Sequence, residues 1–193
     1  MLSSKESLKI LKETDALLEG HFILSSGLHS EKYIQCAKLL SKPKQAKSLC
    51  LSLSEKIKEK LNNIDLILSP AIGGIVIGYE IGRILGIETI FAERVKETFH
   101  LRRGFEIKKN QKILIVEDVI TTGKSSLECS TLATKLGGKI IGFACLIDRS
   151  NGKSKIKDSI VAQVEIDIPT YKTENVPKHL KKIKAIKPGS RNL

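Results

Sequence analysis

The chain has 193 residues, 41% of them hydrophobic and 28% charged, which is the composition of one soluble domain large enough to bury a core. No run approaches the ~20 consecutive apolar residues of a membrane span, and the first residues lack the basic-then-apolar layout of a signal peptide. These features argue against a membrane or secreted protein, so a cytoplasmic location is expected. The net charge of +12 attracts anions without defining which anions.

Residue spacing disfavours two further classes of protein. The four cysteines are far apart, without a C-x-x-C pair: Cys36, Cys50, Cys129 and Cys145. Structural zinc sites and disulfide frameworks need closer ligands, so we expect four reduced, mostly buried thiols. Only eight aromatic residues are present, three Tyr and five Phe. None of them lies in a basic cluster, which argues against stacking on single-stranded nucleic acid.

Helix and strand patterns alternate along the chain. Four segments are predicted to be helices: 7–18, 44–61, 73–85 and 125–136. Four short apolar runs are predicted to be strands: 64–68, 89–92, 112–116 and 139–147. This alternation is the signature of an α/β fold with a central parallel sheet flanked by helices. An alternating apolar run at 160–168 and a proline-punctuated tail then predict a flap that belongs to the same domain.

Chemistry is expected where the strands end, because ligands of open parallel sheets bind beyond the carboxyl ends of the strands. In this chain four residues mark those ends: Leu68, Ala92, Val116 and Ile147. The segment after Val116 is the most specific of the four. There, a buried-type strand delivers two adjacent acids, and a turn rich in hydroxyl groups and a helix start follow at once.

The residues of that segment are Glu117, Asp118, Val119, Ile120, Thr121, Thr122, Gly123, Lys124 and Ser125. A nucleotide P-loop is excluded, because its G-x-x-x-x-G-K-[ST] pattern requires glycine at position 118. A ribose 5-phosphate site fits: the backbone N–H groups of 121–125 and the start of the following helix would hold the phosphate. Glu117 and Asp118 would accept hydrogen bonds from the ribose 2′- and 3′-hydroxyls. The remaining alternative is that these two acids merely cap a helix.

The segment resembles the motif with which type I phosphoribosyltransferases bind phosphoribosyl pyrophosphate (PRPP). It departs from that motif at Lys124, where the family more often has a small residue, and we expect this side chain to face solvent. Further segments are similar, in matching order, to orotate phosphoribosyltransferases: 20–33, 69–74, 145–149, 169–171 and 186–190. The resemblance implies a type I phosphoribosyltransferase-like fold in a single domain, 1–193, with a core of about 44–150 and a small hood from about 1–43 and 151–193.

The same resemblance assigns the base site. Arg149 would bind the orotate carboxylate, for which a planar guanidinium is a bidentate partner. The alternative is that Arg149 forms a surface ion pair with Asp148 or Glu165. Thr121 would face the base from beneath. Ser25 stands where many relatives have Lys, which removes one expected contact near the base.

The segment 92–104 is predicted to be a polar, cationic link between two strands. It holds four basic residues and one histidine: Arg94, Lys96, His100, Arg102 and Arg103. A mobile lid with this content, hinged at Gly104, would offset charge on a departing pyrophosphate.

In the family, a loop at this place carries an Arg-Lys-x-x-Lys-x-His pattern and usually serves the neighbouring subunit. Here only Arg94 is in register, and Val95 replaces the following Lys. Either Lys96 and His100 or the Arg pair at 102–103 would take the remaining roles. We assign Arg94 to PRPP binding and Lys96 to catalysis.

The resemblance therefore implies transfer of the 5-phosphoribosyl group from PRPP to orotate, giving orotidine 5′-phosphate and pyrophosphate in UMP biosynthesis. Mg²⁺ is the expected cofactor, bridging pyrophosphate and ribose hydroxyls without a protein residue as metal ligand. A homodimer is expected, in which the 94–103 loop reaches the neighbouring site, with no nucleic-acid or membrane partner. Two alternatives remain: a purine phosphoribosyltransferase, which Arg149 disfavours, and a non-catalytic PRPP-sensing regulator that binds nucleic acid, which the cationic loop disfavours.

Overall fold

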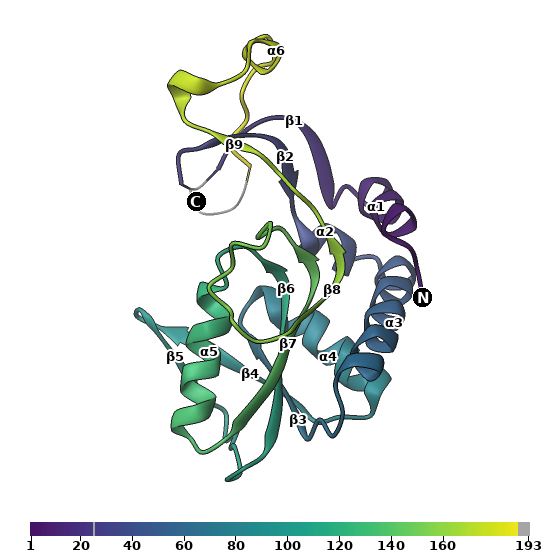
Figure 1. The fold of residues 1–193 in the computed structure, drawn as a ribbon, viewed down its shortest axis with the longest axis vertical. Coiled ribbons are helices and arrows are strands. Elements are labelled where there is room, and N and C mark those ends of the chain that lie inside the picture. Colours follow the sequence, from purple (N-terminus) through teal and green to yellow (C-terminus); the bar gives the residue numbers. More distant parts are fainter. Residues whose placement is uncertain (25, 189–193) are drawn as a thin grey trace.

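The computed structural model describes residues 1–24 and 26–188 and contains two β-sheets (Figure 1). The larger sheet has the strand order β5-β4-β3-β6-β7-β8, and all its neighbouring strands are parallel except β4 and β5. Its strands are β3 (Leu66–Pro70), β4 (Thr89–Val95), β5 (Thr98–Leu101), β6 (Lys112–Ile120), β7 (Lys139–Asp148) and β8 (Ile160–Glu165). The chain adds strands in one direction from β3 and in the other from β6, so a switch point for ligand binding lies between these two strands.

Helices cover both faces of this sheet. One face packs against α3 (Pro43–Lys60) and α4 (Gly73–Leu85), with α1 (Ser4–Glu13) beside them, and the other face packs against α5 (Lys124–Lys135). Successive side chains of β6 alternate between the two faces of the sheet. Leu114 and Val116 pack on the face covered by α3 and α4, and Ile113 and Ile115 pack on the face covered by α5. A strand covered on both faces needs consecutive apolar residues. The predicted α/β fold with a helix-flanked, mostly parallel sheet is confirmed.

The smaller sheet joins segments from the two ends of the chain, at the top of Figure 1. Its antiparallel strands are β1 (Leu17–Ile23), β2 (His29–Ile34) and β9 (Thr170–Tyr171). Short helices flank these strands: α2 (Cys36–Leu40), η1 (Thr173–Asn175) and α6 (Lys178–Lys181). A further bridge pairs Phe22 with Ile186. We call this small sheet the hood. The domain boundaries stay a prediction, and β8, which follows residue 150, belongs to the larger sheet.

The first predicted helix was wrong in its second half. The helix begins earlier than predicted because Ser3 and Glu6 form a capping box, in which each side chain accepts a hydrogen bond from the other residue's backbone N–H. It ends at Glu13, and Asp15 then takes a positive φ of 56°, which turns the chain into β1. The pairing of β1 with β2 therefore overrides the local helical pattern at residues 14–18.

A second expectation concerns the cysteines. All four cysteines are free and buried, as expected. Within residues 1–24 and 26–188, no helix combines the length and the apolar character needed to cross a membrane.

Candidate functional site

An open cavity of about 1140 Å³ lies at the switch point. It is bordered by the loop after β3, the end of β4, Asp118 on β6, and residues of and beside α2. Its polar lining includes Gln35, Glu93, Arg94, Arg103 and Asp118. The cavity is therefore where the parallel-sheet topology predicts chemistry.

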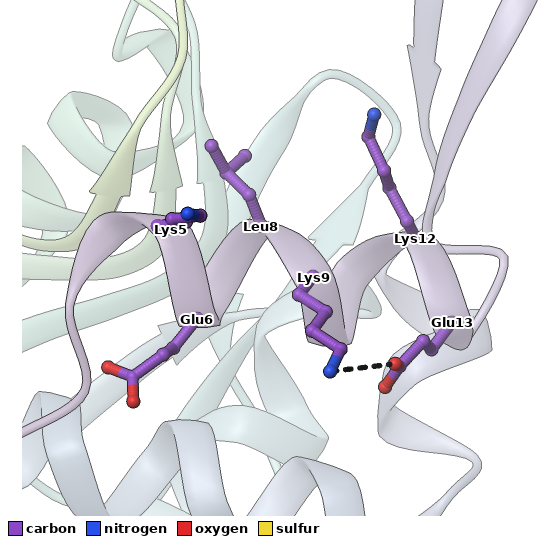
Figure 2. A pocket seen from close by; sticks show the side chains of 6 residues that line it. All are labelled: Lys5, Glu6, Leu8, Lys9, Lys12 and Glu13. Carbon is purple, nitrogen blue, oxygen red and sulfur yellow. Dashed lines mark ion pairs between the residues drawn. The ribbon is translucent and has the colours of Figure 1, made fainter.

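A second hollow, of about 640 Å³, follows the exposed face of α1 (Figure 2). All its lining residues come from this one helix, and Lys and Glu side chains point outward around Leu8. Lys9 pairs with Glu13 across one turn at 3.8 Å. Exposed pairs of this kind are typical of a solvated helix face, so we assign no site there.

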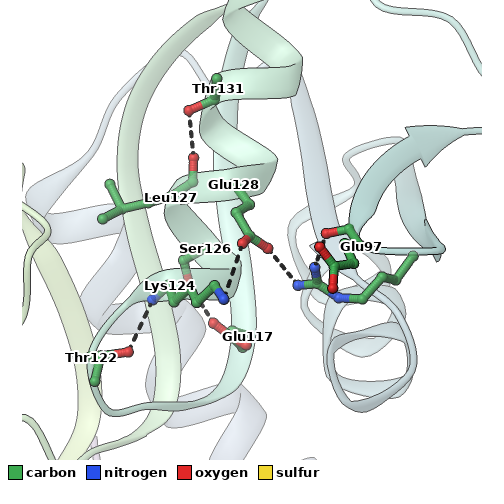
Figure 3. A network of polar contacts seen from close by, with 9 residues as sticks. Glu97, Glu117, Thr122, Lys124, Ser126, Leu127, Glu128 and Thr131 are labelled. Atoms are coloured by element: carbon green, nitrogen blue, oxygen red, sulfur yellow. Dashed lines mark hydrogen bonds and ion pairs between the residues drawn. The ribbon is translucent and has the colours of Figure 1, made fainter.

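The two acids of the motif point to opposite sides of β6. Because side chains alternate along a strand, Glu117 faces α5 and Asp118 faces α4. Glu117 Oε2 accepts a hydrogen bond from the Ser126 hydroxyl (Figure 3). Asp118 Oδ1 accepts from the backbone N–H of Val119 at 3.0 Å, and its carboxylate lies against Gly73, the first residue of α4. The strand extends to Ile120, four residues beyond its predicted end.

Burial shifts the protonation of both acids. It raises the pKa of Glu117 to about 7, with a further increase from the charge of Asp118, while the Ser126 hydrogen bond acts in the opposite direction. Burial also raises the pKa of Asp118, against hydrogen bonds from backbone N–H groups. Buried carboxylates with raised pKa values, at the end of a strand that borders a cavity, are typical of a functional site. The reading of these acids as a simple helix cap is not supported, because the Gly123 cap of α5 makes no side-chain hydrogen bond.

The rest of the motif forms a turn that exposes backbone. Val119 and Ile120 pack into the two sides of the core, so only their backbone groups could contact a ligand. Thr121 and Thr122 are exposed. Gly123 has a φ of 76°, the left-handed region that favours glycine, and α5 begins at the next residue. A helix start of this kind, with N–H groups directed outward, suits a phosphate.

Residues that the sequence interpretation left out support this turn. A β-carbon on Gly123 would lie 2.8 Å from Cγ1 of Ile156 and 2.9 Å from Oγ of Ser154. The backbone N–H of Lys155 donates to the carbonyl oxygen of Thr122 at 3.1 Å. The segment 154–156 thus packs over the turn. The side chains of Lys124 and Lys155 are exposed.

The cationic link is a β-hairpin and not an irregular loop. The strands β4 and β5 pair from Ala92–Leu101 to Val95–Thr98, and Lys96 lies at the tip with a φ of 56°. Arg94 donates to Glu128 Oε2 of α5 at 2.5 Å and to the Glu97 carbonyl at 2.7 Å (Figure 3). Its guanidinium also lies 4.1 Å from the centre of the Phe99 ring.

The same carboxylate also pairs with Lys124, at 3.9 Å, so Glu128 links the hairpin to the first turn of α5. At the base of the hairpin, Glu93 pairs with Arg102 at 3.4 Å and with Arg103 at 2.6 Å. The structure therefore brings Arg94 and Arg103 to the cavity. Lys96 and His100 are exposed on the hairpin, and Lys96 does not line the cavity of the described chain.

Arg149 lies directly after β7 and beside the turn 121–125, which we call the phosphate turn. Its backbone N–H donates to the Ile120 carbonyl at 2.9 Å, which places it next to Thr121. Its Nε is buried and has no hydrogen-bond partner in the described chain, and burial lowers the pKa of the guanidinium. Within the part of the chain that the structure describes, Arg149 forms no ion pair with Asp148 or Glu165. The surface ion-pair alternative is therefore not supported.

Two expectations cannot be placed. Ser25, and the last two residues of the segment 186–190, lie outside the described residues. No group of three or more His, Cys, Asp or Glu side chains among residues 1–24 and 26–188 is arranged to hold a metal ion.

Comparisons with known proteins agree with this geometry. Residues 38–182 match the family model "Phosphoribosyl transferase domain". An orotate phosphoribosyltransferase of Rhizorhabdus wittichii is 44% identical over 191 residues, which cover 98% of this chain and 97% of that protein. The crystal structure of orotate phosphoribosyltransferase from Aeropyrum pernix superposes with a TM-score of 0.70 at 23% identity, covering 82% of this chain and 92% of that chain.

An adenine phosphoribosyltransferase structure from Thermoanaerobacter pseudethanolicus has a TM-score of 0.58 at 18% identity, covering 70% of this chain and 88% of that one. Likeness at such low identity reports the fold and does not choose the base. The choice comes from the near-full-length sequence identity to the Rhizorhabdus protein. The chain belongs to the phosphoribosyl transferase domain family and, within it, to the orotate phosphoribosyltransferases.

Proposed function

We propose that the protein transfers the 5-phosphoribosyl group of PRPP to orotate, giving orotidine 5′-phosphate and pyrophosphate, as a step of UMP biosynthesis. Within the structure, the observation that supports orotate as the substrate is the environment of Arg149. A buried, unpartnered Nε beside the phosphate turn is costly unless an anion completes its hydrogen bonding. The ring carboxylate of orotate is such an anion, and a neutral purine offers none.

Different residues of the chain would bind different groups of the two substrates. The turn 121–125 would hold the 5-phosphate with backbone N–H groups and the start of α5. Glu117 and Asp118 would accept from the ribose hydroxyls, and Thr121 would lie beneath the base. Arg94, which lines the cavity, would meet the pyrophosphate of its own subunit. Lys96, at the hairpin tip, would approach the pyrophosphate bound in the neighbouring subunit.

Catalysis would then rest on positioning and on stabilising the leaving group. The bond from C1 of the ribose to pyrophosphate breaks as N1 of orotate attacks. N1 of orotate loses its proton as the new bond to C1 forms, and an oxygen of the departing pyrophosphate would accept that proton, so no strong protein base is needed. Cations of the hairpin would offset the charge that develops on pyrophosphate.

Mg²⁺ is the proposed cofactor. We propose that the ion enters the site together with PRPP. The ion would supply charge neutralisation on the leaving group, while Glu117 and Asp118 orient the hydroxyls that carry it.

A homodimer is also proposed. Three apolar side chains next to the cavity are exposed along one side of α4 and the residue before it. They are Ile72, Val76 and Tyr79, whose exposed fractions are 85%, 52% and 64%. Spacings of four and three residues put them on one stripe, and a second copy of the chain would cover it. The 94–103 hairpin would then reach the neighbouring site.

We place the reaction in the cytoplasm, because four buried free thiols suit a reducing compartment, and we propose no nucleic-acid partner.

Product binding tests the assignment of orotate. Orotidine 5′-phosphate and UMP differ only in the carboxylate that Arg149 would bind. Calorimetric titration should show the wild-type protein binding orotidine 5′-phosphate about 10- to 100-fold more tightly than UMP. Arg149→Met, which keeps the length and loses the charge, should bind both alike. Equal affinity of the wild-type protein for the two nucleotides would contradict the assignment.

A further inference from the structure

Ser126 lies just beyond the phosphate turn and points away from it. It is the third residue of α5 and is completely buried, whereas Lys124, two residues earlier, is exposed. Its hydroxyl donates to Glu117 Oε2, so the hydrogen bond joins α5 to the carboxyl end of β6 (Figure 3). Within the described chain, this hydroxyl donates to one acceptor, the carboxylate of Glu117 in the candidate ribose site.

The surroundings of Glu117 favour a proton on its carboxyl group. The titratable groups that face it are Asp118 on the same strand, Cys129 on α5 and Cys145 on β7. Burial is the largest cause of the raised pKa of Glu117, and the charge of Asp118 raises it further. The Ser126 hydrogen bond is the contact that acts in the opposite direction.

The protonation state decides what Glu117 can bind. An ionised carboxylate accepts hydrogen bonds at both oxygens, whereas a protonated one uses an oxygen as a donor. Ribose hydroxyls that approach Glu117 as donors need the ionised form. A donor fixed on Oε2 also leaves Oε1 as the oxygen that is available to the substrate.

We propose that Ser126 is a positioning residue, which holds Glu117 ionised and turned toward the ribose of PRPP. The inference rests on the proposed function, since it takes Glu117 to be a ribose ligand. Ser126 itself, buried behind Glu117, touches no substrate.

The test compares Ser126→Ala with Ser130→Ala, which makes the same change one turn along α5. The pH profile of kcat/KM for PRPP is measured for both variants and for the wild-type protein. Loss of a hydrogen bond to a charged group corresponds to a shift of about one pH unit or more. The acidic limb of the Ser126→Ala profile should therefore move about one unit to higher pH. Its kcat/KM should be about tenfold below wild type at pH 6 and close to wild type at pH 9, with Ser130→Ala unchanged.

An equal fractional loss at every pH would mean that Ser126 has only a structural role, and an unshifted profile would mean that it has none. Ser126→Cys, of similar volume with a weaker S–H donor, provides a second variant and should shift the profile less than Ser126→Ala.

A carbon-13 NMR titration of the Glu117 carboxyl group in the free protein separates this inference from the proposed function. A midpoint that moves upward in Ser126→Ala, in a protein that turns over no orotate, would overturn the function and keep the link between Ser126 and Glu117. Normal orotate turnover with an unmoved midpoint would overturn the positioning role and keep the function.

Discussion

A β-carbon on Gly73 would stand 3.0 Å from both carboxylate oxygens of Asp118, so the first residue of α4 and the second acid of β6 meet at the wall of the cavity. Gly73 belongs to the segment 69–74, which is similar to orotate phosphoribosyltransferases, and Asp118 belongs to the motif that resembles a PRPP site. Their contact would put the two halves of the proposed PRPP site side by side. The absence of a side chain at position 73 leaves room for the Asp118 carboxylate.

Gly73→Ala should therefore damage substrate use without damaging the fold. The added methyl group displaces the Asp118 carboxylate by a few tenths of an ångström, and we expect KM for PRPP to rise about tenfold, a loss of about 1.4 kcal/mol. Alanine is a better helix former than glycine, so the free energy of unfolding should be unchanged or slightly higher. Steady-state kinetics and urea unfolding check both effects.

Gly142→Ala provides the contrast, because a β-carbon there would lie 2.9 Å from the Leu61 side chain, away from the cavity lining. It should lower stability and leave KM unchanged. A Gly73→Ala protein with the KM of the wild type would show that Asp118 does not contact the substrate.

Asp118→Asn should reduce kcat/KM for PRPP by at least about 100-fold, the cost of a charge-assisted hydrogen bond. The variant should fold normally, since burial already disfavours the charge of Asp118. Initial rates at varied PRPP concentration measure the first effect, and thermal unfolding measures the second. Unchanged kinetics would remove the ribose assignment.

Glu117→Gln should make the free protein more stable at high pH while reducing its activity. The folded pKa of Glu117 is raised from 4.5 to about 7, so its contribution to stability is lost as the pH rises from 4.5 through 7. The two proteins should unfold alike at pH 4, and at pH 8 the variant should be more stable by up to roughly 3 kcal/mol. Urea unfolding at both pH values measures the difference; a gap that does not grow with pH would contradict the burial argument.

Lys96→Gly tests the catalytic assignment without disturbing the hairpin. Glycine adopts the positive φ of this position readily, so the substitution removes the ammonium group and keeps the turn. We expect kcat to fall at least about tenfold with unchanged unfolding. The control is Asn110→Gly, because Asn110 is also exposed and has a positive φ. This variant should keep both the kcat and the unfolding behaviour of the wild-type protein. An unchanged kcat in Lys96→Gly would contradict the catalytic assignment of Lys96 and leave Arg102, Arg103 and His100 as the candidates.

The central sheet and its motif were predictable because their signals are local. The apolar run 112–116 and the acids after it needed only the knowledge that buried parallel strands are apolar on both faces. Arg149 was singled out by the resemblance to orotate phosphoribosyltransferases, and its place just after a predicted strand agrees with that. The hood could not be located by periodicity, since β2 pairs with β9 through His29–Tyr171 contacts far apart in sequence. The helix predicted over 7–18 failed for the same reason, because nonlocal pairing turns residues 17–18 into strand.

Side-chain partners were the other part that the sequence did not reveal. Glu128 and Ser126 follow the motif at helical spacing, but their contacts with Arg94 and Glu117 depend on how α5 packs against β4 and β6. The hairpin at 92–101 was predicted as an irregular lid because its charged residues obscure the alternation of two short strands.

Turnover of orotate is the measurement that tests the account most directly. Loss of orotate absorbance is followed in the ultraviolet with PRPP and Mg²⁺, beside parallel reactions with uracil, hypoxanthine and adenine. We predict consumption of orotate that requires both PRPP and Mg²⁺, with no consumption of the other three bases. Turnover of a purine without turnover of orotate would contradict the account, and it would show that Arg149 serves another purpose.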